Sequence, residues 1–176
     1  MLAGRPATAP AWTAIEVARA LRRPRALATL DAALRSGTCG QDELWRSVER
    51  QSGGRGVVAA RELLAVASPL ADSPMASEAR LVVIDGGMPL PMLQYVVVDL
   101  QGRVWRLDFA WPECRVGAEY DGVDWHSGPD AFVRDRRRWA ALQELGWLIV
   151  PIIAEDVRHR PGELVRRLEA QLRKAA

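Results

Sequence analysis

Apolar residues recur at three- and four-residue spacing through the first seventy residues of the chain, which is the spacing of one face of a helix. The four segments that carry this pattern end near Gly, Ser or Pro, where helices commonly stop. They cover residues 13–23, 25–37, 42–51 and 55–67. The pattern predicts a helical packing or linker region over residues 1–72.

The character of the chain changes at residues 67–74, ASPLADSP, which contain two prolines and two serines and are typical of a boundary. Directly after them, Ser73 is a candidate N-cap and Pro74 suits the first position of a helix. This helix is expected to end at Gly86 and Gly87. We therefore expect a second domain over residues 73–176.

Three runs with strand character follow this helix, and they are separated by the short segments LQG and PEC. The runs cover residues 92–99, 103–111 and 115–121. A helix is predicted from 129 to 145, a strand buried on both faces at 147–153 (WLIVPII), and a last helix at 162–173. The order predicts an α/β domain with a three-stranded antiparallel meander, a further strand and covering helices.

Composition narrows the class of protein only moderately. The net charge is +2, so charge alone does not indicate a nucleic-acid partner. The two cysteines, Cys39 and Cys114, are too few for a disulfide framework or a zinc site of paired cysteines. The first ten residues lack the apolar core of a secretory signal, and no apolar run is long enough to span a membrane. We expect a cytoplasmic protein with no membrane partner.

The acids around the predicted turn of the second hairpin are the first candidates for chemistry. If Glu113 and Cys114 form the centre of a four-residue loop, cross-strand partners have numbers that sum to 227. Asp108 then lies opposite Glu119, and like charges at such positions are destabilising. A loop one residue longer or shorter would place the two acids on opposite faces.

Strand alternation puts a third acid, Asp121, on the same face as Glu119. Three carboxylates on one patch need a compensating cation. Either an arginine supplies it or a hard divalent metal does, and Mg²⁺ favours one or two carboxylates. The residues alone leave these two alternatives open, together with a third in which the acids are only a polar surface.

Two further residues extend this candidate site. His126 lies in the loop DGVDWHSG, and its ordinary pKa of about 6.5 suits a general base. Asp135 shares a helical stripe with Trp139 and Leu142, so it is expected to face the sheet. Arg134 and Arg138 lie four residues apart on the same helix and could hold a phosphate backbone.

From Ser73 onward the chain resembles the family called domain of unknown function 559. That family is similar to the very-short-patch mismatch-repair endonucleases, within the PD-(D/E)xK superfamily. The resemblance lies in RLDFAWP (106–112), VGAEYDGVDWH (116–126) and RDRRRWAALQELGW (134–147). It implies a restriction-endonuclease-like core and Mg²⁺- or Mn²⁺-dependent hydrolysis of DNA, in repair or in defence.

The resemblance also implies roles for single residues. Asp108 and Glu119 match the metal-ligand acids, and the backbone carbonyl of Tyr120 matches a third ligand. Asp121 falls where many members have a catalytic lysine. The resemblance further implies that His126 acts as the general base and that Asp135 supports it. The residues implied to contact DNA are Trp125, Arg134 and Arg138.

Two positions depart from the family pattern, and they motivate an alternative function. Ala76 stands where relatives have a glutamate, and Glu78 lies about 200° round the helix from it. No lysine follows Glu119. The residues before Ser73 resemble the linker region of longer relatives that begin with a winged-helix domain of the AbiEi antitoxin type. The alternative to an endonuclease or nicking enzyme is thus a catalytically weakened nuclease fold that serves as a DNA-binding or antitoxin-like regulatory module.

Overall fold

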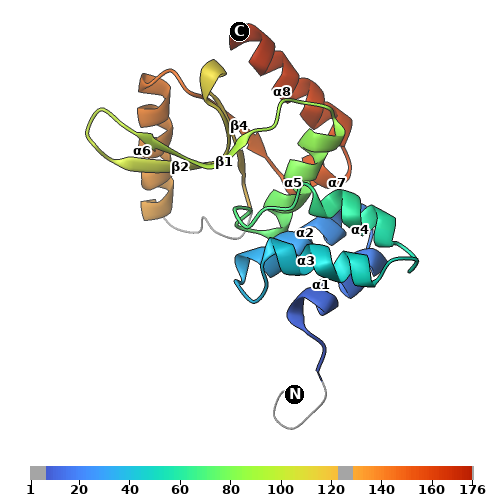
Figure 1. The fold of residues 1–176 in the computed structure, drawn as a ribbon. Helices are drawn as coiled ribbons and strands as arrows, with labels where there is room; N and C mark the ends of the chain where they lie inside the picture. The colour runs from blue at the N-terminus through green and yellow to red at the C-terminus, as the bar shows by residue number, and fades with distance from the viewer. Residues whose placement is uncertain (1–6, 123–128, 176) are drawn as a thin grey trace. The chain divides into compact units, whose positions relative to one another are not determined.

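The computed structural model describes residues 7–122 and 129–175, and the chain divides into two compact units (Figure 1). The first unit extends to Leu81 and the second begins at Val82. The division therefore lies inside helix α5 (Pro74–Asp85), nine residues after the boundary expected from composition. The reason is that Arg80 and Leu81 pack in the first unit although the helix to which they belong begins at Pro74.

The first unit is helical, as the apolar spacing predicts. Its helices before α5 are α1 (Pro10–Ala20), α2 (Arg23–Arg35), α3 (Gln41–Arg50) and α4 (Val57–Leu64). Prolines occupy the first turns of α1 and α2, where a missing N–H costs no helical hydrogen bond. The core side chains come from all four helices, and they include Ile15, Leu27, Leu30, Leu44, Val48, Leu63 and Leu64.

A buried ion pair crosses this core between α2 and α5. Asp31 is 0% exposed, and Arg80 donates Nη2 to both of its carboxylate oxygens at 2.9 and 2.8 Å. The backbone N–H of Ser68 donates to Asp31 Oδ1 at 2.8 Å, and Arg80 Nη1 donates to the carbonyl of Val66. Several hydrogen bonds are needed to offset the desolvation of two buried charges, and this pair has them.

The second unit is a mixed α/β fold built on one four-stranded sheet of order β1-β2-β3-β4. The strands are β1 (Met92–Val98), β2 (Val104–Trp111), β3 (Val116–Tyr120) and β4 (Leu148–Ile152). The first three form the predicted antiparallel meander, and β4 pairs parallel to β3. The fold class expected from the order of elements is thus confirmed at this level.

Three α-helices accompany the strands of this unit: α6 (Pro129–Glu144), α7 (Ala154–Arg158) and α8 (Pro161–Ala175). Leu142 of α6 packs against Val97, Leu107 and Ala110 of the sheet, while α8 packs on β3 and β4. The short helix α7 was not predicted. Ser73 caps α5 as expected, since its Oγ accepts the N–H of Ala76 at 3.0 Å.

The prediction that residues 147–153 are buried on both faces is wrong. The strand is present as β4, but it lies at the edge of the sheet, where Leu148 is 43% exposed and Pro151 is also exposed. A proline has no backbone N–H to give to a neighbouring strand, so an edge position suits it. The apolar run therefore reflects one covered face, and not two.

A buried carboxylate organises the turn between β1 and β2. Asp99 accepts hydrogen bonds from the backbone N–H groups of Gln101 and Arg103 at 2.9 and 2.8 Å. It also accepts Arg103 Nε at 2.6 Å and the indole Nε1 of Trp105 at 2.9 Å. Burial by itself raises the pKa of Asp99, but these donors outweigh it and lower the pKa to about 2.

We expect Asp31→Asn to lower the free energy of unfolding by about 3 to 5 kcal/mol, because it leaves the guanidinium of Arg80 buried without its counter-charge. Urea denaturation of the variant measures this. Glu49→Gln, a change at an exposed acid of α3, is the matched control and should shift stability by less than about 0.5 kcal/mol. Equal effects of the two changes would show that the buried pair is not a stabilising element.

We expect Asp99→Asn to destabilise the second unit near neutral pH and to lose this effect in acid. The pKa of Asp99 is lowered in the folded state, so its contribution is present above the ordinary value of 3.8 and is lost as the pH falls towards about 2. Melting temperatures of both proteins between pH 2 and 6 should therefore converge at the acid end. A gap that stays constant over this range would contradict the assignment, and Glu113→Gln at an exposed acid controls for a general effect of acid.

Candidate functional site

The register of the β2–β3 hairpin is the one predicted from the sequence. Phe109 pairs with Ala118 and Trp111 with Val116, so partner numbers sum to 227. The loop is a 3₁₀ turn at Pro112–Cys114 followed by Arg115 in a left-handed conformation, φ 50°. Four loop residues keep the parity on which the placement of the acids depends.

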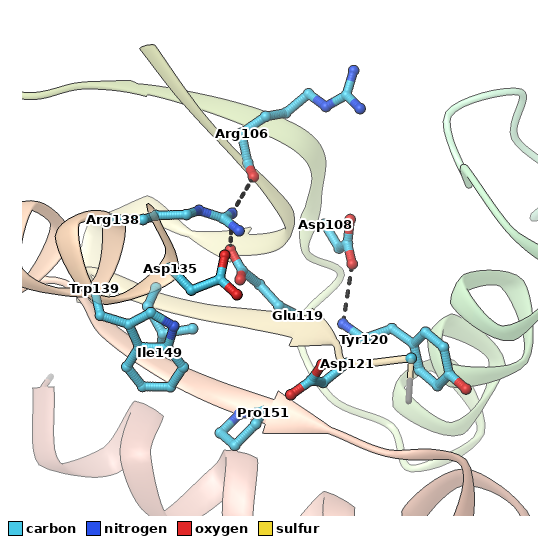
Figure 2. Close-up of a pocket in the computed structure, with 11 residues that line it drawn as sticks. Arg106, Asp108, Glu119, Tyr120, Asp121, Asp135, Arg138, Trp139, Ile149 and Pro151 are labelled. Carbon is cyan, nitrogen blue, oxygen red and sulfur yellow. Dashed lines mark hydrogen bonds and ion pairs between the residues drawn. The ribbon is translucent and has the colours of Figure 1, made fainter. Parts of the chain in front are cut away.

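This register brings the predicted acids to one pocket of the second unit, which we call the acid pocket (Figure 2). Carboxylates from β2, β3, the segment after β3 and α6 line it, together with cationic, aromatic and apolar groups. The lining residues are Arg106, Asp108, Glu119, Tyr120, Asp121, Gly122, Asp135, Arg138, Trp139, Ile149 and Pro151.

Both oxygens of Asp108 accept hydrogen bonds from its neighbours. Oδ2 accepts the backbone N–H of Tyr120 at 3.0 Å, and Oδ1 accepts Nε2 of Gln94 at 3.2 Å. The expected role of Tyr120 was a backbone carbonyl directed at a metal, whereas the contact that the structure shows is made by its N–H. These two donors fix the orientation of the Asp108 carboxylate across the hairpin from Glu119.

Glu119 has an arginine as its partner. Arg138 of α6 donates Nη2 to Glu119 Oε1 and to the carbonyl of Arg106, the latter at 2.6 Å (Figure 2). The Glu119 side chain is only 17% exposed. Of the two cations that the sequence left open for this acid, the structure therefore places an arginine.

The pKa of Glu119 is raised although an arginine is its partner. Burial is the largest cause of its rise from 4.5 to about 7. The guanidinium of Arg138 lowers the pKa, while the charges of Asp108, Asp121 and Asp135 raise it. Near neutral pH the Glu119 carboxyl therefore gains and loses a proton, which is common for acids in functional clefts.

The other predicted site residues divide into three groups. Asp121 and Asp135 line the acid pocket, as the strand and helix patterns predict. Arg134 lines a different pocket and is not brought together with Arg138. His126 and Trp125 lie outside the described residues. Their predicted roles, and the catalytic roles of the acids, stay predictions.

Gln94 is a site residue that the sequence analysis missed. It is a non-glycine residue at φ 51° inside β1, a conformation that costs energy and often marks functional positions. Its Nε2 holds Asp108, and its Oε1 is buried with no hydrogen-bond partner in the described part of the chain. The available signal was a single amide in the apolar run MLQYVVV.

The described acids do not by themselves form a recognised cluster of metal ligands. Within residues 7–122 and 129–175, no group of three or more His, Cys, Asp or Glu side chains could hold a metal ion. Arg138 occupies one oxygen of Glu119, and two donors hold Asp108. A divalent cation at these acids would compete with these donors for the carboxylate oxygens.

We expect Glu119→Gln to stabilise the protein in mild alkali and not in acid. The pKa of Glu119 is raised in the folded state, so the free energy of unfolding of the wild type falls as the pH rises from about 4.5 to about 7. Above pH 7 it stays lowered by the full free-energy cost of ionising this buried carboxyl. The glutamine keeps the shape and avoids this cost, about 3 kcal/mol at most, since one pKa unit corresponds to about 1.4 kcal/mol. Urea denaturation at pH 5 and pH 8 tests this, and a variant less stable than the wild type at pH 8 would contradict it.

Comparison with known proteins gives one family and two relatives. Residues 1–66 match the family model described as AbiEi antitoxin C-terminal domain, which supports the antitoxin-like character expected for the N-terminal part. Two uncharacterized proteins of Mycobacterium tuberculosis, from strains CDC 1551 / Oshkosh and ATCC 25618 / H37Rv, are each 59% identical over 174 residues. These residues are 99% of this chain but only 64% of each relative, so the chain spans less than two thirds of their length.

No solved structure matches the chain. Its N-terminal part is thus similar to an antitoxin domain.

Proposed function

We propose that this chain is part of a cytoplasmic, antitoxin-like regulatory protein that binds DNA without cutting it efficiently. The observation that carries the proposal is the match of residues 1–66 to the AbiEi antitoxin C-terminal domain. In the described part of the chain, no helix is both long and apolar enough to cross a membrane. The chain spans less than two thirds of its relatives' length, so the proposal concerns only the part that the chain shares with them.

The basic side of α6 supports DNA as the partner in this proposal. Arg134 and Arg137 are exposed on one side of this helix. Arginines on one helix can hold phosphate groups, which position a protein on nucleic acid without reading its sequence. The contact is therefore expected to be strongly salt-dependent, as neutralised phosphates release their counterions.

The state of the acid pocket supports binding over efficient cleavage. Arg138 pairs with Glu119, so the acid expected to hold a metal has a protein cation beside it. In the sequence, Ala76 stands where the suspected nuclease family has a glutamate, so this position offers no carboxylate. Both features favour a nuclease-like fold used for contact.

A second candidate function is a Mg²⁺- or Mn²⁺-dependent endonuclease or nicking enzyme. The observation that favours it is the gathering of Asp108, Glu119, Asp121 and Asp135 at one pocket, with the pKa of Glu119 raised to about 7. Acids gathered in a cleft, with a raised pKa among them, are common at catalytic sites. On this hypothesis Asp108 and Glu119 would hold the metal, which would polarise a phosphate oxygen and would compete with Arg138 for the Glu119 carboxylate.

Supercoiled plasmid separates the two candidates. We expect wild-type protein to retain plasmid and duplex fragments in a gel, with affinity falling about 10³-fold or more between 50 and 200 mM salt if six phosphates are neutralised. No nicked or linear product should form with Mg²⁺ or Mn²⁺. Retention should be at least tenfold stronger for a fragment from upstream of the protein's own gene than for a random fragment if the role is regulatory.

The variants for this experiment are Asp108→Asn and Ala76→Glu. Cleavage by the wild type that disappears in Asp108→Asn would replace our proposal with the second candidate. A gain of cleavage in Ala76→Glu would show that this helix position limits catalysis in an otherwise competent site. If the folded wild-type protein neither retains nor cleaves the DNA, both candidates are overturned.

A further inference from the structure

A second pocket of the same unit contains cations and an aromatic ring, and we call it the arginine pocket. Its lining comes from the start of β2 and from the first half of α6, and it consists of Arg103, Trp105, Val133, Arg134 and Arg137. No carboxylate is among these described lining residues. Its chemistry is therefore opposite in sign to that of the acid pocket on the same helix.

The Trp105 side of the arginine pocket is held rigidly by the buried Asp99. The Trp105 indole and the Arg103 Nε both donate to Asp99 Oδ2, at 2.9 and 2.6 Å. Arg103 also donates Nη2 to Gln101 Oε1 at 2.9 Å, and its guanidinium carbon lies 5.6 Å from the centre of the Trp105 ring. Two planar groups are thus fixed before any ligand arrives, which lowers the ordering cost of binding.

The α6 side of the pocket supplies charge. Arg134 and Arg137 are three residues apart, so they project from the same side of the helix. Both side chains are exposed. An anion that enters between Arg134 and Arg137 would meet two guanidinium groups, which can each donate two parallel hydrogen bonds to phosphate oxygens.

We propose that the arginine pocket is a subsite for one nucleotide of an unpaired nucleic-acid strand. The base stacks on the Trp105 and Arg103 platform, and Arg134 and Arg137 hold the adjoining phosphate. Aromatic rings and guanidinium planes are the groups on which unpaired bases stack, and a paired base has no open face to offer. The proposal rests on the nucleic-acid binding proposed above. It adds the place at which a strand binds, and it states that the strand is unpaired at that place.

The position of the subsite relates it to the acid pocket. Arg134 and Arg138 are one turn apart, which is about 6 Å along the helix axis. A stacked strand rises about 3.4 Å per nucleotide, so a strand held at Arg134 reaches Arg138 within roughly two nucleotides. The pocket therefore holds a strand in reach of the Arg138–Glu119 pair without needing either residue for affinity.

Fluorescence anisotropy of a fluorescein-labelled oligothymidylate of eight nucleotides measures binding to the subsite. Trp105→Phe and Trp105→Leu both lose the indole hydrogen bond to Asp99, and only the first keeps an aromatic ring. Trp105→Leu should weaken binding by about 5- to 150-fold relative to Trp105→Phe, the range of single base–aromatic stacks. Equal affinities of these two variants would overturn the stacking platform, and circular dichroism confirms that both are folded.

Arginine variants test the phosphate contact on the same helix. Arg134→Gln and Arg137→Gln should each weaken binding several-fold and lower the slope of log affinity against log salt by about 0.7. Arg136→Gln removes the same charge from a residue that lines neither pocket, and it is the matched control. An equal loss in the control would mean that the helix attracts the strand only by overall charge, which contradicts a defined subsite.

A direct readout separates failure of the subsite from failure of the proposed function. In ¹H–¹⁵N spectra, the Trp105 indole signal, identified by its absence in Trp105→Phe, should shift on addition of a thymidine or uridine tetranucleotide, and the two nucleotides show whether the strand is DNA or RNA. The same shift with a tetraglutamate peptide would mean that the pocket binds acidic protein, and it would overturn the proposal. No shift, in a protein that retains duplex DNA, overturns the subsite alone, whereas a shift without duplex retention overturns only the proposed function.

Discussion

The loop between β2 and β3 contains four residues, and this even length decides on which face of the sheet the acids of the hairpin lie. With Phe109 opposite Ala118, the next step along both strands brings Asp108 towards Glu119. The backbone N–H of Tyr120 then reaches the Asp108 carboxylate. An insertion of one loop residue would carry Glu119 to the other face and separate it from Asp108, Asp135 and Arg138 together. The backbone register of the hairpin therefore determines that the acids meet in one pocket.

Once the register has gathered the acids, their charge must be compensated, and the compensation found here comes from the protein itself. Arg138 lies between Glu119 and the Arg106 carbonyl, so it satisfies an acceptor of the strand as well as an acid. Arg138 lowers the pKa of Glu119, but burial, together with the charges of Asp108, Asp121 and Asp135, raises it further than the arginine lowers it. The pocket is thus electrostatically strained but hydrogen-bonded, which is a state that a protein maintains where charge is used.

Much of this architecture follows from sequence because it depends on local patterns. Apolar spacing located the N-terminal helices, glycines and prolines located the ends of α5, and strand parity gave the hairpin register. The features that were missed depend on three-dimensional neighbours. Gln94 is one polar residue in an apolar strand, and its backbone angle has no sequence signature. The run WLIVPII is apolar whichever position its strand takes in the sheet, so periodicity could not show that β4 is an edge.

The arginines of α6 show the same limit in another form. Arg134 and Arg138 are four residues apart, which correctly places them near one side of a helix, and the natural inference is a joint phosphate site. The sheet beneath the helix changes along its length, however: the Arg134 end lies beside Trp105 and Arg103, and the Arg138 end beside Glu119. Identical side chains one turn apart therefore have different partners, because the helix supplies their spacing and the sheet supplies their surroundings.

Arg138 is consequently the residue on which the two candidate functions diverge. A nucleic-acid strand that approaches the acid pocket meets Asp108, Asp121 and Asp135, and repulsion between phosphate and carboxylate opposes its approach. While Arg138 remains on Glu119, its charge reduces this repulsion, and the surface can bind a strand without reacting with it. If Arg138 leaves to pair with a phosphate, Glu119 loses the charge that lowers its pKa, and protonation of its carboxyl becomes more favourable. The two proposed functions therefore differ in the partner of Glu119, which would be Arg138 in a module that only binds DNA and a metal ion in a nuclease.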